Sequence, residues 1–328
     1  MQSFHKKIIK SEFKPAWWCK NHHLQTLFPA LFRRHPELTL NNEQLELEDG
    51  DFLDLVWTEE KDKNSPIIIL LHGLEGSINS PYAKGILKTI SNNNWQGVLM
   101  HFRGCSGRHN RLNRSYHSGE TGDIHTLITE LKKRYPERPL AAIGISLGGN
   151  VLLKYLGEQN KQCLLSAAMA ISVPFDLADG AIKLNQGFSK LYQRHLINSL
   201  QRRLRHKFKH KQAPVDIDRL NEWTDFYSFD HNVTAPIHGF DSADDYYTKS
   251  SSKQFLIQIT TPTLILHSKD DPFMSQKSIP TEKELSDSVS LELTEHGGHV
   301  GFIYGDNPFD ARYWIEKRLR EFFKSIFV

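Results

Sequence analysis

From residue 66 onward, short apolar runs alternate with longer segments of mixed polarity. Six runs are rich in apolar residues, and several are apolar at every position, as strands covered on both faces must be. These runs are residues 66–73, 96–104, 139–146, 167–174, 262–269 and 288–295. Mixed segments with a helical pattern stand between and after them, at residues 81–92, 123–135, 147–158 and 309–324. This alternation predicts a mainly parallel sheet with helices on both faces.

One interval is too long to be an ordinary connection. About 87 residues separate Pro174 from Pro262, which predicts a folded insertion. Within it, residues 183–212 contain nine Lys or Arg, no acidic residue, and apolar residues at near-helical spacing. We therefore expect a cap with one or two basic amphipathic helices. The predicted division is an N-terminal extension (1–45), a first part of the core (46–174), the cap (175–255) and a second part of the core (256–328).

Composition narrows the class of protein. The 328 residues include 41 Lys or Arg and 38 Asp or Glu, a balance that does not argue for nucleic acid as a partner. The cysteines Cys19, Cys105 and Cys163 are far apart and form no CxxC pair, which favours a reducing compartment. The N-terminus lacks the apolar stretch of a signal peptide, and no run approaches the ~20 apolar residues of a membrane span. We expect a soluble cytoplasmic protein.

The segment GISLG (144–148) lies where an apolar run meets a helical segment. It has the GxSxG form of a nucleophile elbow, in which a strand turns sharply into a helix and presents a serine. Glycines are needed at both ends, because a side chain there would collide with neighbouring backbone. An ordinary strand-to-helix turn is the alternative, but the strand before and the helix after favour Ser146 as a nucleophile.

The serine needs a base, and the base needs an orienting acid. Behind an elbow these follow in the order acid, then histidine, each after a later strand. Asp270 and Asp271 both end the first apolar run after the cap. We choose Asp271 as the acid, because it lies deeper in its loop and precedes Pro272. Asp270 is then expected to be an Asx-type turn residue, and it stays the alternative for the acid.

Two histidines compete for the role of base. His296 and His299 both follow the last apolar run. We choose His299, because Gly297 and Gly298 let its loop pass close to the elbow. His296 is expected to face solvent or to support the site.

An ester carbonyl under attack becomes an oxyanion that needs N–H donors. One donor would be the backbone of Leu147, after the nucleophile. The other would be that of Leu74, in the loop after the run 66–73. His72 in this loop is expected to brace it by hydrogen bonds and not to act in catalysis.

The segment HFRGCSG (101–107) places two further nucleophilic side chains at the same edge of the predicted sheet. Cys105 has no histidine partner in the expected order, and Ser106 lacks the strand-to-helix turn. Arg103 is expected to anchor the loop. The segment is therefore predicted to shape the site and not to attack the substrate.

We predict neither a metal nor a cofactor. His22 and His23 lack the spacing of a metal motif, and His206 and His210 lie among cations that would repel a metal ion. No GxGxxG or P-loop sequence supports nucleotide binding.

The cap leaves two questions open. Its cationic run fits a solvated helix face, or attraction to anionic substrates or an anionic membrane surface. Nucleic-acid binding comes last, because no recognised nucleic-acid-binding module accompanies the charge. Its aromatic residues fit the cap's own core or the lining of an acyl pocket; they are Trp223, Phe226, Tyr227, Tyr246 and Tyr247.

The combined motifs resemble the YheT-like branch of the α/β-hydrolases. The motifs that carry the resemblance are HGLEG (72–76), HFRGCSG (101–107), GISLGGN (144–150), DDPFM (270–274) and GGHVGF (297–302), with NHHLQTLFP (21–29), DGDFLDLVW (49–57) and FDHNVTAPIHGFDSADDYY (229–247). This branch includes bacterial esterases, eukaryotic lipases acting on medium-chain acyl groups, and yeast alcohol acyltransferases. The resemblance implies an α/β-hydrolase fold, carboxylic-ester chemistry, and a triad that maps onto Ser146, Asp271 and His299.

The leading hypothesis is a serine hydrolase that cleaves carboxylic esters of short- or medium-chain acyl groups through an acyl-enzyme. Its partner would be a small-molecule acyl ester, with peripheral membrane contact through the basic cap. One alternative is an alcohol acyltransferase with the same triad. Another is a non-catalytic binding protein on a hydrolase scaffold. The natural ester and the oligomeric state stay open.

Overall fold

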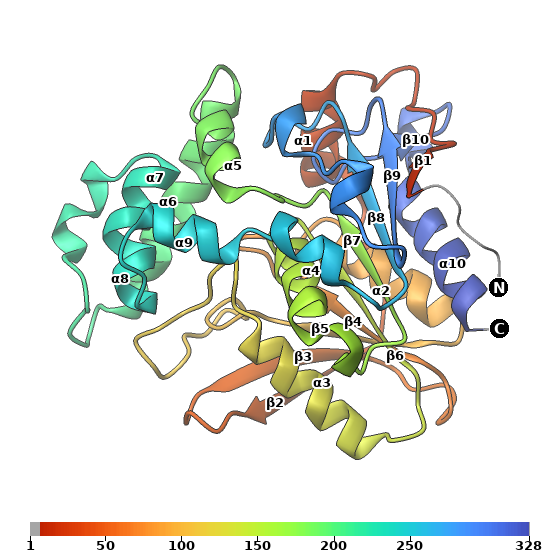
Figure 1. The fold of residues 1–328 in the computed structure, drawn as a ribbon, viewed down its shortest axis with the longest axis horizontal. Helices are drawn as coiled ribbons and strands as arrows, with labels where there is room; N and C mark the ends of the chain where they lie inside the picture. The colour runs from red at the N-terminus through yellow and green to blue at the C-terminus, as the bar shows by residue number, and fades with distance from the viewer. Residues whose placement is uncertain (1–6, 328) are drawn as a thin grey trace.

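A nine-stranded sheet forms the centre of the computed structural model, which describes residues 7–327 (Figure 1). Residues 1–6 of the predicted N-terminal extension lie outside the described residues. The strand order is β1-β9-β8-β7-β6-β4-β5-β3-β2, and the pairs from β1 to β5 are parallel. Strands β2 and β3 are antiparallel to their neighbours. The strands are β1 (Ile8–Lys10), β2 (Leu40–Glu46), β3 (Phe52–Thr58), β4 (Ile67–Leu71), β5 (Gln96–Met100), β6 (Leu140–Ile145), β7 (Ala167–Ile171), β8 (Thr263–Ser268) and β9 (Val289–Thr294).

The six predicted apolar runs form the strands β4 to β9. Every residue of β4, β6 and β7 is buried, because helices cover both faces of the sheet. Helices α3 (Gly122–Arg134) and α4 (Leu147–Gln159) pack on one face, with Leu127 and Leu152 in the shared core. Helices α2 (Ala83–Asn92) and α10 (Trp314–Ile326) pack on the other. The predicted α/β fold with a mainly parallel sheet is confirmed.

The sequence pattern missed both edges of the sheet. Strand β2 carries only one fully buried side chain, Leu45, so its run lacks the continuous apolar character of the central strands. Strand β1 has three residues and pairs with β9. In the chain, α1 (His22–Phe32) follows β1 and precedes β2, and it packs against the loop after β9. The segment preceding residue 46 is thus part of the sheet and not only an appendage.

The last predicted helix begins later than expected. Residues 309–313 contain the end of a short 3₁₀ turn and β11 (Arg312–Tyr313), which pairs with β10 (Ile303–Tyr304). Helix α10 then starts at Trp314. Pro308 occupies the first position of the 3₁₀ turn, where the missing N–H of proline is tolerated.

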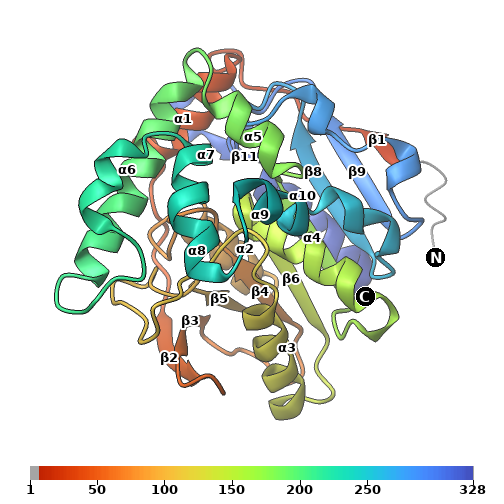
Figure 2. The ribbon, with the colours of Figure 1, turned by 60° about the vertical axis from the view of Figure 1, so that its left-hand side comes forward.

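The long interval between β7 and β8 contains a mainly helical insertion (Figure 2). Its principal helices are α5 (Leu177–Leu184), α6 (Ser189–Lys207), α7 (Phe226–Phe229), α8 (Ala235–His238) and α9 (Ala243–Ser250). Leu200 and Leu204 on α6 pack with Trp223 and Phe229 in a small core of their own. Within residues 7–327, no helix has both the length and the apolar character needed to cross a membrane.

Candidate active site

Ser146 occupies a sharp turn between β6 and α4. Its backbone has φ 51° and ψ −117°, outside the regions that L-residues usually adopt, so the turn is strained. A Cβ on Gly144 would lie 2.4 Å from the carbonyl oxygen of Gly148, and one on Gly148 would lie 2.5 Å from that of His72. The glycines therefore permit the close backbone contacts that the turn requires.

This packing predicts the effect of Gly148→Ala. The added methyl group cannot avoid two carbonyl oxygens, those of Leu71 and His72, so the backbone must shift. We expect the free energy of unfolding to fall by about 1–3 kcal/mol, with a lower Tm in differential scanning calorimetry. In the control Gly180→Ala, on α5, the new Cβ would lie 3.9 Å from the carbonyl oxygen of Phe273, an ordinary contact distance, and Tm should hold or rise. An unchanged Tm for Gly148→Ala would contradict this account.

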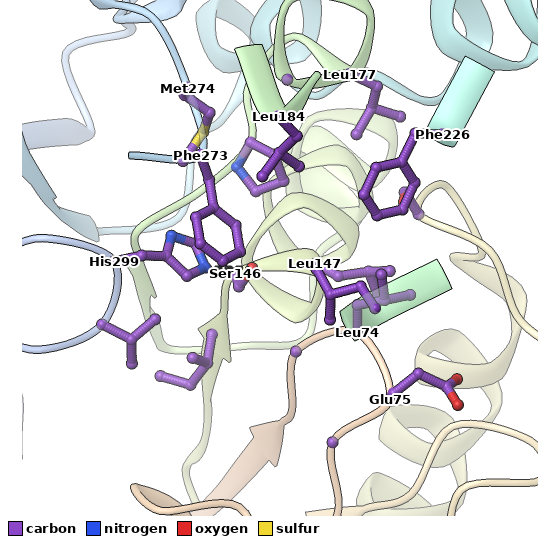
Figure 3. A pocket seen from close by; sticks show the side chains of 18 of the residues that line it. Leu74, Glu75, Ser146, Leu147, Leu177, Leu184, Phe226, Phe273, Met274 and His299 are labelled. Atoms are coloured by element: carbon purple, nitrogen blue, oxygen red, sulfur yellow. Dashed lines mark hydrogen bonds between the residues drawn. The ribbon is translucent and has the colours of Figure 1, made fainter. Parts of the chain in front are cut away.

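Three side chains from separate loops form a hydrogen-bonded chain at the turn. The Nε2 of His299 lies 2.9 Å from Ser146 Oγ, and its Nδ1 lies 2.8 Å from Asp271 Oδ2. Asp271 is buried, and its other oxygen accepts a hydrogen bond from the N–H of Phe273. The Phe273 ring stacks on the imidazole with centroids 3.9 Å apart and planes 6° from parallel (Figure 3). Carboxylate and aromatic ring together hold the histidine toward the serine.

Asp270 and His296 take no part in the hydrogen bonds that join Ser146, His299 and Asp271. Asp270 Oδ1 accepts a hydrogen bond from the N–H of Gly298, and Oδ2 lies 3.3 Å from His296 Nδ1. The His296 side chain is about half exposed. Asp270 therefore supports the backbone just before His299, whereas we had expected a local turn role.

The two predicted oxyanion donors border the same space. Leu74 and Leu147 both line the cavity beside Ser146 (Figure 3). On either side of Leu74, the N–H of Gly73 donates to Tyr82 Oη and that of Glu75 donates to Tyr116 Oη, both at 2.8 Å. These two hydrogen bonds hold the backbone on both sides of Leu74, whose N–H is the predicted oxyanion donor.

A cap residue also holds this loop. Arg203 of α6 forms an ion pair with Glu75 at 2.8 Å, and its guanidinium carbon lies 4.8 Å from the centroid of the Tyr116 ring. Glu75 has φ 55°, a conformation that needs support in a residue other than glycine. Sequence reasoning missed this contact, because Arg203 is one of nine similar cations in its segment.

His72 supports the loop that carries Leu74 through hydrogen bonds of both its ring nitrogens. Its Nδ1 lies 2.7 Å from the carbonyl oxygen of Gly73, and its Nε2 accepts from the N–H of Phe102 at 3.1 Å. These contacts assign the proton to Nδ1. Complete burial lowers the pKa of His72 to about 3, so the ring stays neutral. This is the structural role expected from the sequence.

The loop 101–107 is tied down by its polar side chains. Arg103 is buried among the carboxylates of Asp49, Asp51 and Asp123, which makes it an anchor. Cys105 Sγ lies 2.9 Å from a nitrogen of Arg203, and burial raises the pKa of the thiol to about 11. The neighbour at this distance is a guanidinium and not a base, and the thiolate that would attack is scarce at neutral pH.

Helix α1 supports the histidine loop, a role that sequence reasoning missed. The N–H of His299 donates to Thr26 Oγ1 at 2.9 Å, and that of Ile303 donates to Gln25 Oε1 at 2.6 Å. A Cβ on Gly301 would lie 2.2 Å from the carbonyl oxygen of Gln25. The segment 21–29 carried a family resemblance, but nothing in it indicated which loop it would contact.

The Ser146 hydroxyl opens into a cavity of about 400 Å³ between the sheet and the cap. Many of its lining side chains are apolar, and six of them are Leu74, Leu177, Leu184, Leu200, Phe226 and Phe273 (Figure 3). Three polar residues that are hydrogen-bonded to one another also line the cavity: Asp230, Thr234 and Tyr247. Asp230 accepts hydrogen bonds from Thr234 and Tyr247, and burial raises its pKa to about 6.

The aromatic residues of the cap divide between the two roles that the sequence left open. Phe226, Tyr246 and Tyr247 line the cavity. Trp223 packs in the cap's own core, and Tyr227 is about half exposed. Within the described residues, no group of three or more His, Cys, Asp or Glu could hold a metal ion.

Comparisons with known proteins agree with this architecture. The family described as alpha/beta hydrolase fold matches residues 66–306. "Putative esterase YheT" of Escherichia coli is 42% identical over 313 residues, which cover 94% of this chain and 92% of that protein. "Medium-chain fatty acid ethyl ester synthase/esterase 2" of Saccharomyces cerevisiae is 27% identical, over 81% of this chain and 63% of that protein.

A solved structure shares the fold at low sequence identity. The esterase Pf2001 of Pyrococcus furiosus has a TM-score of 0.59 over 89% of this chain and 92% of its own, at 16% identity. The resemblance predicted from the motifs is confirmed by the sequence comparisons. The chain therefore belongs to the α/β hydrolase family, as a YheT-like member of its esterase and lipase type.

Proposed function

We propose that the protein is a serine hydrolase that cleaves carboxylic esters of short- or medium-chain acyl groups. The observation that carries this proposal is the hydrogen-bonded chain from Ser146 through His299 to Asp271, which ends in a largely apolar cavity. A non-catalytic binding protein would have no need for a serine, a base and a buried acid in this alignment.

In the first half of the reaction, Ser146 Oγ attacks the ester carbonyl and its proton passes to His299 Nε2. Asp271 accepts the Nδ1–H and stabilises the imidazolium that forms. The N–H groups of Leu74 and Leu147 bind the oxyanion of the tetrahedral intermediate. As the intermediate collapses, His299 returns the proton to the departing alcohol, which leaves an acyl group on Ser146.

In the second half, water attacks the acyl-enzyme while His299 accepts one of its protons. The second tetrahedral intermediate uses the same two N–H donors. Its collapse releases the carboxylic acid and restores the serine hydroxyl. The leucine and phenylalanine side chains around the serine favour an acyl chain over a polar acid as the group that is bound.

A series of aryl esters with acyl chains of two to sixteen carbons tests the proposal. The value of kcat/KM should rise with each CH₂ that the apolar wall covers, by up to about fourfold per group. It should fall once the chain exceeds the cavity. Absence of hydrolysis for every chain would overturn the proposal, and a maximum at the longest chains would overturn its assignment of chain length.

Acyl transfer to an alcohol is the second candidate, because the name of the yeast relative includes an ester synthase activity. The two reactions share the acyl-enzyme and differ in whether water or an alcohol attacks it. Adding ethanol to the assay and measuring ethyl ester against free acid separates them. Ester formation faster than acid release would replace hydrolysis with transfer as the main activity.

A further inference from the structure

The cavity lies next to an unusual surface of exposed apolar side chains. Among residues 7–327, eleven large hydrophobic side chains are exposed, and six belong to two neighbouring segments. We call these six the mouth surface: Leu24, Leu31 and Phe32 on α1, and Ile182, Phe188 and Leu191 on and between α5 and α6. Leu31, Phe32 and Ile182 each expose more than 60% of their area. Such clustering differs from the scattered apolar residues of ordinary surfaces.

The two segments touch each other and both line the cavity. The His23 ring of α1 lies 4.3 Å from that of Phe188, and its Nδ1 lies 3.0 Å from Tyr192 Oη. Figure 2 shows α1 beside α5 and the start of α6. Pro29 of α1 and Leu184 of α5 line the cavity, as does Ala30, which is itself exposed. The mouth surface therefore flanks the cavity where it meets solvent.

The charges near the mouth surface are mostly positive. The acid of α5, Asp179, accepts hydrogen bonds from Ser275, and Arg33 is paired with Glu316. Residues 14–34 contain four Lys or Arg and no acidic residue, and residues 180–212 contain nine and none. Lys20, Lys190 and Arg194 are exposed there. Apolar side chains inside a field of cations match the chemistry of an anionic lipid surface.

Two of the more distal cations of α6 are engaged within the protein, whereas Arg202 and Arg205 are exposed. Arg203 pairs with Glu75, and Lys207 donates to Asn110 Oδ1 and to the carbonyl oxygen of Arg114, both at 2.7 Å. Burial, with help from nearby cations, lowers the pKa of Lys207 to about 7. Arg203 and Lys207 are thus not free to contact lipid, and the exposed cations next to the mouth surface are Lys190 and Arg194 in the N-terminal part of α6.

We propose that the mouth surface docks on an anionic lipid bilayer, so that an ester lipid can pass from the bilayer into the cavity. The proposal rests on the ester hydrolase function and names the source of its substrate. A lipid ester held in a bilayer must leave apolar surroundings to reach Ser146. Leu31, Phe32 and Ile182 inserted among the acyl chains would keep its path apolar, while the lysines and arginines contact the headgroups.

Vesicle cosedimentation tests docking without relying on catalysis. Ser146→Ala protein should sediment with vesicles of phosphatidylcholine and phosphatidylglycerol, and much less with phosphatidylcholine alone. Replacing Leu31, Phe32 and Ile182 together with glutamine should weaken binding to the anionic vesicles at least about tenfold. Replacing Lys190 and Arg194 with glutamine should weaken it mainly at low salt, since these charges act through the surface potential.

Leu164→Gln is the matched control. Leu164 is also exposed, but it precedes the amino end of β7, whereas Ser146 follows the carboxyl end of the parallel neighbour β6. This variant should bind vesicles as the parent does, and each mouth variant carrying Ser146 should cleave a soluble aryl ester at the normal rate. Failure of the parent to bind anionic vesicles, or equal losses in control and mouth variants, would overturn the docking proposal while leaving the hydrolase proposal intact.

A second copy of the chain is the competing occupant of the mouth surface. Analytical ultracentrifugation of the parent and of the triple glutamine variant shows whether the mouth surface forms a dimer. A dimer that the triple glutamine variant converts to a monomer would overturn the bilayer proposal. A parent that stays monomeric and binds anionic vesicles supports it.

Discussion

Replacing Ser146 with alanine should lower kcat for ester hydrolysis by about 10⁶-fold and abolish covalent labelling by a fluorophosphonate. The side chain lies 2.9 Å from His299 Nε2 and faces the cavity, whereas no other hydroxyl in the described structure makes this contact with the imidazole. Mass spectrometry of the labelled parent should place the phosphonate on Ser146. The melting temperature of the variant should stay close to that of the parent, because the methyl group fits where the Cβ already lies.

Cys105→Ala is the control for this prediction. The thiol is partly buried beside Arg203, and its hydrogen bonds among residues 7–327 include none with a histidine, so its loss should leave most of the activity. An inactive Cys105→Ala protein together with an active Ser146→Ala protein would reverse the assignment of the nucleophile. Folded parent protein that takes up no label would favour the non-catalytic binding alternative.

The sequence could predict the elements whose chemistry is local. The run LAAIGI of β6 is apolar at every position because both faces of the strand are covered. Gly144 is required by a contact inside the turn itself, and Gly148 by the backbone of the neighbouring strand β4, which any serine elbow in such a sheet approaches. The order of serine, acid and histidine follows from the order of the strands, since parallel strands bring their carboxyl ends to one edge of the sheet. These features therefore needed no knowledge of distant contacts.

Contacts between distant segments could not be predicted in this way. Thr26 and Gln25 hold the histidine loop from a position more than 270 residues earlier in the chain, and Arg203 reaches the oxyanion loop from the cap. Such side chains look like ordinary surface residues of a helix until the packing angle of that helix is known. The edge strand β2 escaped detection for a related reason, because a half-exposed strand needs few apolar residues.

The support of the triad is thus spread over the whole chain, while its reacting atoms come from three short loops. Helix α1 fixes the backbone of His299, Asp270 fixes that of Gly298, and Phe273 covers the imidazole. These residues hold the histidine in place, whereas Asp271 sets its tautomer by accepting the Nδ1–H. The two neighbouring aspartates allow the difference to be measured.

Asp271→Asn should leave the protein folded and lower kcat by about 10⁴-fold. The asparagine oxygen can still accept the hydrogen bond from the N–H of Phe273, so the loop keeps its shape. The amide nitrogen then faces His299 Nδ1 and donates to it, which leaves the imidazole proton on Nε2. A protonated Nε2 cannot accept the proton of Ser146, and the base is lost although its position is kept. Steady-state kinetics with an aryl ester, at matched Tm, measure the effect.

Asp270→Asn provides the comparison at the adjacent position. Its oxygen can still accept from the N–H of Gly298, and the contact with His296 lies outside the chain from Ser146 to Asp271. We expect a loss of about tenfold or less, arising from a looser histidine loop. If Asp270→Asn proved inactive and Asp271→Asn retained activity, the carboxylate that orients His299 during catalysis would be Asp270. That outcome would require the loop after β8 to rearrange by one residue on substrate binding, because only Asp271 reaches the imidazole in this structure.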